Sequence, residues 1–148
     1  MSKPKLLISA CLMGENVRYD GGNNLIDQIE QLKEKYELVP VCPEVSSGMI
    51  VPRMPNEIQS IEPLVVKNEF NIDTTEYFID GAKQTLHICI QLDVKVALLK
   101  AKSPSCGNLE VYDGTFSKTL IKGQGLTANI LMQHNIKVYN ENQIGELI

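Results

Sequence analysis

Short, uninterrupted runs of apolar residues recur along this chain and predict buried strands. An apolar run without alternation is typical of a strand that is covered on both faces, as in a parallel sheet. Four such runs occupy residues 5–10, 38–41, 95–99 and 136–139. A shorter run at residues 64–66 predicts an edge strand.

Between these runs, apolar residues recur at intervals of three and four, which is the spacing of a helix. The pattern predicts helices over residues 24–36, about 74–92, 125–134 and 141–148. The apolar stripe of the first helix consists of Leu25, Ile29 and Leu32. The second helix opens on a capping-box sequence, Asp73-Thr74-Thr75-Glu76. Its apolar stripe consists of Phe78, Ala82, Leu86, Cys89 and Ile90.

Two long segments carry neither pattern. Residues 43–63 contain four prolines, and each proline removes a hydrogen-bond donor and fixes φ. We therefore expect no regular helix and no central strand there. Residues 102–122 are rich in Gly, Ser and Asn and are also expected to form a loop. Loops of this length in a compact domain are usually functional.

The order of these elements indicates the fold class. Strands that alternate with helices predict an α/β fold with a mainly parallel, Rossmann-like sheet flanked by helices. No linker or long repeat divides the chain, so we expect one domain over residues 1–148. In sheets of this type, ligands bind beyond the carboxyl ends of the strands.

Composition narrows the class of protein. The 148 residues are 43% hydrophobic and 22% charged, which is typical of a globular domain. The net charge of −4 gives no support for binding a nucleic-acid backbone.

No run reaches the roughly 18 apolar residues of a membrane span, and the apolar stretch before Cys11 is too short for a signal peptide. We expect a cytoplasmic protein with reduced thiols. The sequence does not specify its oligomeric state.

Three of the four cysteines follow predicted strands. Cys11 follows the first strand, Cys42 follows the second, and Cys106 lies in the loop after residues 95–99. Because the carboxyl ends of parallel strands share one edge of a sheet, we expect these three thiols to converge. Cys89 lies instead on the apolar stripe of a helix, where a cysteine most often serves packing.

Several chemistries can use three converging thiols. A structural zinc site usually takes four ligands, often from CxxC pairs, and the chain has no CxxC. Three ligands suit a catalytic metal or a cluster with one open position. A thiolate nucleophile needs a nearby base or cation, and both histidines, His87 and His134, fall on predicted helices. Position alone leaves these alternatives open.

Polar residues next to these cysteines are candidate site residues. Glu44 lies two residues after Cys42 and offers a carboxylate. Ser103 and Ser105 offer two hydroxyls just before Cys106. The three side chains are therefore placed to act on a ligand held at the thiols.

Further candidates lie in the loops at the same edge. Arg18 and Arg53 could bind a planar or anionic substrate, although exposed arginines are often only solvated. The sequence Tyr-Asp-Gly occurs twice, at Asp20 and at Asp113, where the simpler interpretation is a pair of turns. Gly125, in Gly123-Gln124-Gly125, opens a helix whose N–H groups could contact an anion.

Taken together, these motifs resemble the DUF523 family, whose characterised members are 2-thiouracil desulfurases. The resemblance extends from about residue 8 to residue 139. The matching segments are Ser9-Ala10-Cys11-Leu12-Met13-Gly14, Val17-Arg18-Tyr19-Asp20-Gly21, Pro40-Val41-Cys42-Pro43-Glu44, Pro52-Arg53, Asp80-Gly81-Ala82, Lys102-Ser103-Pro104-Ser105-Cys106-Gly107, Tyr112-Asp113-Gly114-Thr115-Phe116 and Gly123-Gln124-Gly125-Leu126-Thr127-Ala128.

The resemblance implies a [4Fe–4S] cluster held by Cys11, Cys42 and Cys106, with one iron open for a substrate sulfur. It implies that Glu44 and Ser103 assist catalysis. The family reaction replaces the sulfur of a thiolated pyrimidine by oxygen and releases hydrosulfide without net redox change. The expected ligand is thus a small thio-nucleobase.

Two other functions remain as alternatives. The first is a sulfurtransferase that carries a persulfide on Cys106. The second is a non-enzymatic cluster-binding sensor or scaffold, in which Cys89 would supply a fourth ligand. The chain also departs from its relatives at Met13, at Ser46-Ser47 and at Met49-Ile50, where relatives often have Leu or Gly. These departures could reshape the substrate pocket.

Overall fold

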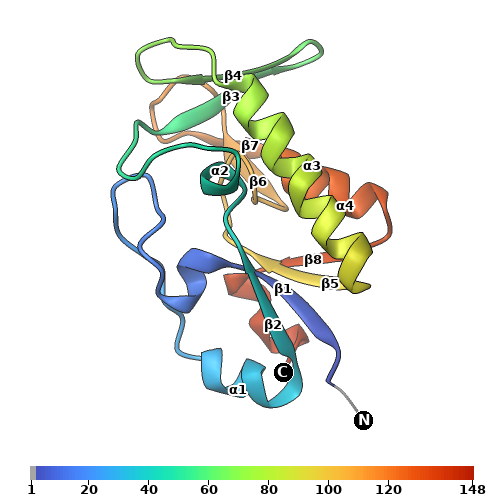
Figure 1. The fold of residues 1–148 in the computed structure, drawn as a ribbon. Coiled ribbons are helices and arrows are strands. Elements are labelled where there is room, and N and C mark those ends of the chain that lie inside the picture. Colours follow the sequence, from blue (N-terminus) through green and yellow to red (C-terminus); the bar gives the residue numbers. More distant parts are fainter. Residues whose placement is uncertain (1–2) are drawn as a thin grey trace.

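A four-stranded parallel sheet lies at the centre of the computed structural model, which describes residues 3–148 (Figure 1). The strand order is β2-β1-β5-β8, and all three pairings are parallel. The strands are β1 (Lys5–Ser9), β2 (Glu37–Val41), β5 (Val96–Leu99) and β8 (Lys137–Asn140). The predicted α/β class and the four central strands are confirmed.

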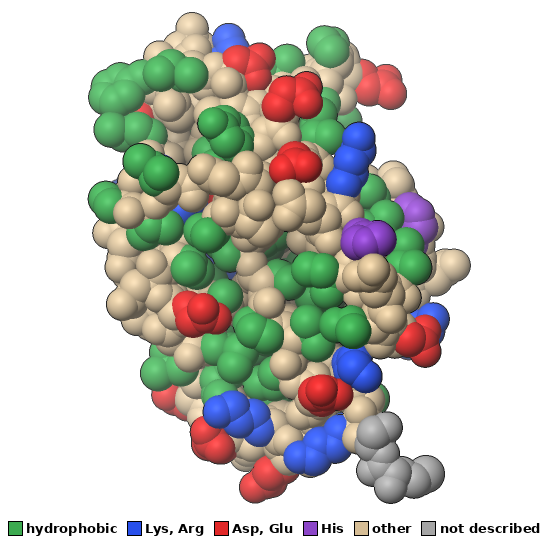
Figure 2. All heavy atoms as spheres, viewed as in Figure 1, with side chains coloured by type: hydrophobic (Ala, Val, Ile, Leu, Met, Phe, Trp, Pro, Cys, Tyr) green, Lys and Arg blue, Asp and Glu red, His purple; other side chains and the backbone are tan. Residues whose placement is uncertain are grey.

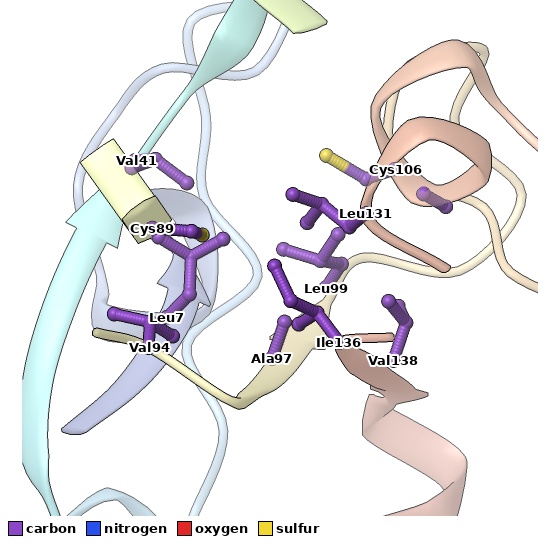
Figure 3. Packing of buried hydrophobic residues seen from close by; sticks show 11 residues of the cluster. Leu7, Val41, Cys89, Val94, Ala97, Leu99, Cys106, Leu131, Ile136 and Val138 are labelled. Carbon is purple, nitrogen blue, oxygen red and sulfur yellow. The ribbon is translucent and has the colours of Figure 1, made fainter. Parts of the chain in front are cut away.

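Helices cover both faces of this sheet (Figure 1). One face packs against α3 (Thr75–Leu92) and α4 (Leu126–Gln133), and the other packs against α1 (Ile29–Lys35) and the short 3-10 helix η2 (Glu141–Glu146). Side chains of a strand alternate between faces. Within β1, Leu7 therefore joins the first core cluster, shown in Figure 3, while Leu6 and Ile8 join the second. This burial on both faces explains the continuous apolar run.

Two antiparallel hairpins lie outside the central sheet. One pairs β3 (Asn56–Ile61) with β4 (Leu64–Asn68), and the other pairs β6 (Glu110–Tyr112) with β7 (Leu120–Lys122). Strand β4 confirms the short strand predicted at residues 64–66, whereas β3, β6 and β7 lie in segments that were expected to be loops. In the first segment, the prolines fall outside the strands, where they remove no ladder hydrogen bond.

A one-turn helix, α2 (Pro43–Ser46), also interrupts the proline-rich segment. Pro43 is its first helical residue, and a proline is tolerated there because that N–H has no partner within the helix. The expectation of no helix was therefore wrong at this point. The turn places Glu44, two residues after Cys42, at the carboxyl end of β2.

The helices differ from the sequence-based predictions in three respects. The helix expected from residue 24 begins only at Ile29, and Leu25 is exposed. The capping box does not form at α3; instead the Asp73 carboxylate accepts the N–H of Thr75. Ile90, assigned to the apolar stripe, is 64% exposed. The stripe is completed by Gly81 and Thr85.

The surface drawn in Figure 2 mixes acidic and basic side chains among its described residues, without an extended basic patch. Among the helices of residues 3–148, none combines the length and the hydropathy that crossing a membrane requires.

Candidate functional site

A cavity of about 570 Å³ opens at the carboxyl ends of β1, β2 and β5. Its floor comes from the ends of these strands, and residues of the two hairpins complete its wall. Cys11, Cys42 and Cys106 all line it. The structure therefore brings together the three thiols that the positions of the strands predicted to converge.

Each of these cysteines is held by a different local structure. Cys11 lies in η1 (Ala10–Met13), a 3-10 turn that directly continues β1. Cys42 is the N-cap of α2, directly after β2. Cys106 lies in the loop after β5 and is 5% exposed. All three, like Cys89, are free thiols.

Burial raises the pKa of all three thiols at the cavity. For Cys106, a hydrogen bond with Ser9 opposes this effect, while the neighbouring Cys42 and Cys11 reinforce it. For Cys11, burial is opposed first by a hydrogen bond with Asn24. The raised pKa values favour the neutral thiols, and a nearby positive charge would be needed to stabilise the thiolates.

The hydroxyl group of Ser103 stabilises the loop that carries Cys106. Ser103 Oγ accepts the backbone N–H groups of Ser105 and Cys106, each at 3.1 Å. The Ser103 carbonyl accepts the N–H of Gly107 at 2.9 Å. Ser103 thus shapes the turn that presents Cys106, and its own hydroxyl hydrogen stays available to the cavity that it lines.

The N-terminus of α4 supports this loop from behind. Gly125 N–H donates to the Gly107 carbonyl at 2.8 Å, and the next N–H groups donate to the carbonyls of Pro104 and Ser105. Gly125 does not line the cavity. The predicted contact between Gly125 and an anionic substrate is therefore not supported, because protein carbonyls occupy these donors.

Glu44 and Arg53 form an ion pair at the cavity wall. Glu44 Oε2 accepts two hydrogen bonds from the guanidinium, from Nε at 2.9 Å and from Nη2 at 2.5 Å. Ser105 Oγ donates to the other oxygen, Oε1, at 3.3 Å. The side chains of Arg53 and Glu44 are only 8% and 13% exposed. The carboxylate is therefore held from both sides.

The predicted role of Arg53 changes as a result. Its Nη2 also donates to the Val17 carbonyl at 3.1 Å, and its Nη1 donates to the Ile50 carbonyl at 3.3 Å. Most of its donors are thus taken by the protein, and its guanidinium holds the Glu44 carboxylate. Ser105, also predicted to bind substrate, shares this positioning contact.

The other predicted binding residues divide into two groups. Arg18 lines the cavity and donates to Asn24 Oδ1 at 3.0 Å. Asp20 and Asp113 lie outside the cavity lining. Each accepts a backbone N–H two residues ahead, from Gly22 and from Thr115, which is the hydrogen bond of an Asx-turn. The simpler interpretation of both Tyr-Asp-Gly sequences, as turns, is confirmed.

Nearly the whole chain matches a known protein family. The model of the 2-thiouracil desulfurase family matches residues 6–143. The chain belongs to this family.

Two relatives show how far the similarity extends. The uncharacterized protein YbbK of Bacillus subtilis (strain 168) is 34% identical over 150 residues, which cover 97% of this chain and 99% of YbbK. A solved structure described as the [4Fe-4S]-dependent thiouracil desulfidase TudS (DUF523Vcz) is 37% identical. It superposes with a TM-score of 0.91 and covers 98% of this chain and 95% of TudS. The family fold therefore applies to the full length of the chain.

Two charged residues of this family member were missed at the sequence level. Lys100, directly after β5, lines the cavity and pairs with Glu141 at 2.8 Å. The three cysteines were predicted from their positions after strands. Lys100 also follows a strand, so the same pattern could have predicted it. Glu57 also lines the cavity. It lies on β3, a strand that the sequence pattern did not predict, so no signal pointed to it.

Proposed function

We propose that this protein is an iron–sulfur-dependent desulfurase that converts a thiolated pyrimidine, such as 2-thiouracil, to its oxo form. In the overall reaction, water adds to the carbon of the C=S bond and the sulfur leaves as hydrosulfide, so no electrons are gained or lost. One observation carries the proposal. Two buried thiols, Cys11 and Cys106, and the half-buried thiol of Cys42 line a single cavity, and the described residues supply no fourth cysteine to it.

The donor set fits a [4Fe–4S] cluster better than a single ion. Within residues 3–148, no three His, Cys, Asp or Glu side chains converge closely enough to hold one metal ion. A cluster binds each thiolate at a different iron, so its ligands need not meet at a point. Cys11, Cys42 and Cys106 would hold it. The family match and the TudS structure support this assignment.

Cys89 does not complete the ligand set. It is 1% exposed in the core between α3 and the sheet, and it does not line the cavity (Figure 3). Burial raises its pKa to about 11. The sensor alternative that relied on Cys89 as a fourth ligand therefore has no support in this geometry.

When bound, the cluster supplies a Lewis-acidic iron that carries no cysteine ligand. The protein supplies proton transfer and orientation. Glu44 accepts a proton from the attacking water and returns it to a ring nitrogen or to the leaving sulfur, and its hydrogen bonds with Arg53 and Ser105 fix its direction. General acid–base catalysis of this kind contributes about 10²–10⁴-fold. Ser103 donates its hydroxyl hydrogen to water or substrate.

The sulfurtransferase alternative fits the site less well. A persulfide carrier needs a reactive thiolate, which proteins obtain by lowering the pKa of an accessible cysteine. Cys106 is 5% exposed, and its burial raises the thiol pKa. Without a metal centre, this cysteine is therefore poorly suited to nucleophilic attack.

The test uses protein purified and reconstituted with iron and sulfide in the absence of oxygen. We expect 2-thiouracil absorbance to fall while uracil and sulfide appear in equal amounts. Glu44→Gln should keep its iron and lose about 10²–10⁴-fold in kcat. The matched control is Glu62→Gln, an exposed position on the β3–β4 turn. Full iron content without turnover of 2-thiouracil would contradict the proposed substrate.

A further inference from the structure

Glu57 is a buried carboxylate on the cavity wall that the mechanism above does not use. It lies near the start of β3 and is 8% exposed. Its Oε1 accepts two backbone N–H groups of the turn between β6 and β7, from Gly114 at 2.9 Å and from Phe116 at 3.2 Å. One oxygen of this carboxylate is therefore committed to the protein.

The second oxygen of Glu57 is differently placed. Oε2 forms no hydrogen bond with any residue between 3 and 148 that the structure describes. In that part of the chain, the only fully enclosed side-chain oxygen or nitrogen without a partner is Thr127 Oγ1. Glu57 Oε2 is therefore accessible, and Glu57 lines the cavity. Because each oxygen of a carboxylate can accept hydrogen bonds, Oε2 can accept one from a donor on a bound ligand.

The turn that Glu57 holds also faces the cavity. Phe116 and Lys118 both line it, and both adopt positive φ angles, 56° and 62°. Non-glycine residues adopt this conformation at a cost, and they keep it only where the surroundings impose it. Gln59 Nε2 adds a hydrogen bond to the Gly114 carbonyl at 2.9 Å. Strand β3 thus fixes the backbone of the turn at Gly114 and Phe116.

These contacts place an aromatic ring and a carboxylate acceptor on one wall. Phe116 offers a flat apolar face, and Glu57 Oε2 offers an acceptor within the same cavity. A planar heterocycle with a ring N–H matches both, because the ring can pack on an aromatic side chain while the N–H donates to the carboxylate. Hydrogen bonds to charged groups are the strong ones in protein sites.

We propose that Glu57 is a specificity-determining residue whose Oε2 accepts a hydrogen bond from a ring N–H of the bound heterocycle. This inference rests on the proposed function for the choice of a pyrimidine. Glu57 acts in binding and is separate from Glu44, which belongs to α2 and to the proton-transfer step.

The experiment measures binding rather than turnover. Uracil and 1,3-dimethyluracil, which lacks ring N–H groups, are titrated into the reconstituted protein by calorimetry. Wild-type protein should bind uracil more tightly than the dimethyl analogue. Glu57→Gln should weaken uracil binding by about 10–100-fold and leave binding of the dimethyl analogue unchanged, because the amide presents a donor to the ring N–H. Glu62→Gln, on the same hairpin, is the matched control.

A second variant separates recognition from support of the turn. Gln59→Ala removes one hydrogen bond to the turn and keeps the Glu57 acceptor. Amide hydrogen exchange at Gly114 and Phe116 should accelerate in Gln59→Ala and stay slow in Glu57→Gln, whose amide oxygen can still accept both N–H groups. Discrimination between uracil and its dimethyl analogue should persist in Gln59→Ala.

Two results would overturn the inference. One is equal binding of uracil by wild type and Glu57→Gln, and the other is a wild type that does not distinguish uracil from 1,3-dimethyluracil. Either result can occur while the wild type still converts 2-thiouracil. A protein that discriminates the two ligands through Glu57 but releases no sulfide would instead contradict the proposed function alone.

Discussion

Arg53 connects three segments of the site through one side chain. Its guanidinium donates to Glu44 on α2, to the Val17 carbonyl in the loop after η1, and to the Ile50 carbonyl in the loop after α2. Its backbone N–H also donates to the Tyr19 carbonyl. A planar fork with five N–H donors can satisfy several acceptors at once, which an ammonium group cannot do in the same geometry.

Arg53→Lys should therefore lower kcat by about 10–100-fold and change KM much less, because the lysine cannot hold the Glu44 carboxylate in place. In combination with Glu44→Gln, the second substitution should add little further loss, since both act on the same step. Steady-state kinetics of the two single variants and the double variant measure this coupling, at matched iron content. Losses that multiply fully in the double variant would show that Arg53 acts independently of Glu44.

At the scale of single residues, the sequence pattern predicted the site residues that follow strands. It did not predict those whose positions depend on the geometry of loops. The three site cysteines could be placed together because the end of a parallel strand fixes the position of the next residue. The partners of Arg53 could not be predicted, because they come from loops that carry no periodic pattern. Glu57 was missed for a related reason, since the hairpin that orients it has no clear signal.

The contact between α2 and α3 sets the position of Glu44 and Cys42 at the level of whole elements. Gly81 of α3 lies directly against Pro43, and an added Cβ there would be 2.3 Å from the Pro43 carbonyl oxygen. In an isolated helix, alanine is favoured over glycine by about 1 kcal/mol. Here the close approach of α2 requires glycine.

Gly81→Ala should therefore lower the free energy of unfolding by about 1–3 kcal/mol, in spite of its better helix propensity, and should reduce iron uptake by displacing Cys42. Urea denaturation and iron analysis measure the two effects. Gly145→Ala is the control, because a Cβ at Gly145 meets nothing within 4 Å. If Gly81→Ala were as stable as the wild type, the close packing of α2 on α3 would be wrong.

The central strands were predictable because their burial on both faces leaves a continuous apolar run. Strand β4 was also predicted, at residues 64–66, but β6 and β7 were not, because they have only three residues each and stand among turn residues. In residues 43–63, the prolines suggested a loop, yet the chain places β3 between Pro55 and Pro63. Counting prolines could not show that the positions between them were free to pair.

Across the whole molecule, the three cysteines come from segments that are distant in the sequence and that no disulfide joins. A centre bound by all three would therefore stabilise the folded state and not the unfolded chain. The increase in the free energy of unfolding depends on the ratio of the effective ligand concentration to the dissociation constant of the ligand. A hundredfold excess corresponds to about 2.7 kcal/mol.

Reconstitution with iron and sulfide should accordingly raise Tm by about 5–10 °C, and removal of iron by a chelator should reverse the rise. Thermal unfolding followed by circular dichroism under nitrogen measures the shift. Cys11→Ser should lose the increase, whereas Cys89→Ala should keep it from a lower starting Tm, because its thiol only fills the core. An unchanged shift in Cys11→Ser would exclude Cys11 as a ligand.

The support that α4 gives to the Cys106 loop has a consequence for biosynthesis. The helix that holds this loop is translated after Cys106 itself, so a nascent chain on the ribosome presents Cys11 and Cys42 well before the third thiol is in place. A cluster delivered during synthesis would find only two ligands. Insertion of the proposed cluster would therefore follow the synthesis and packing of α4.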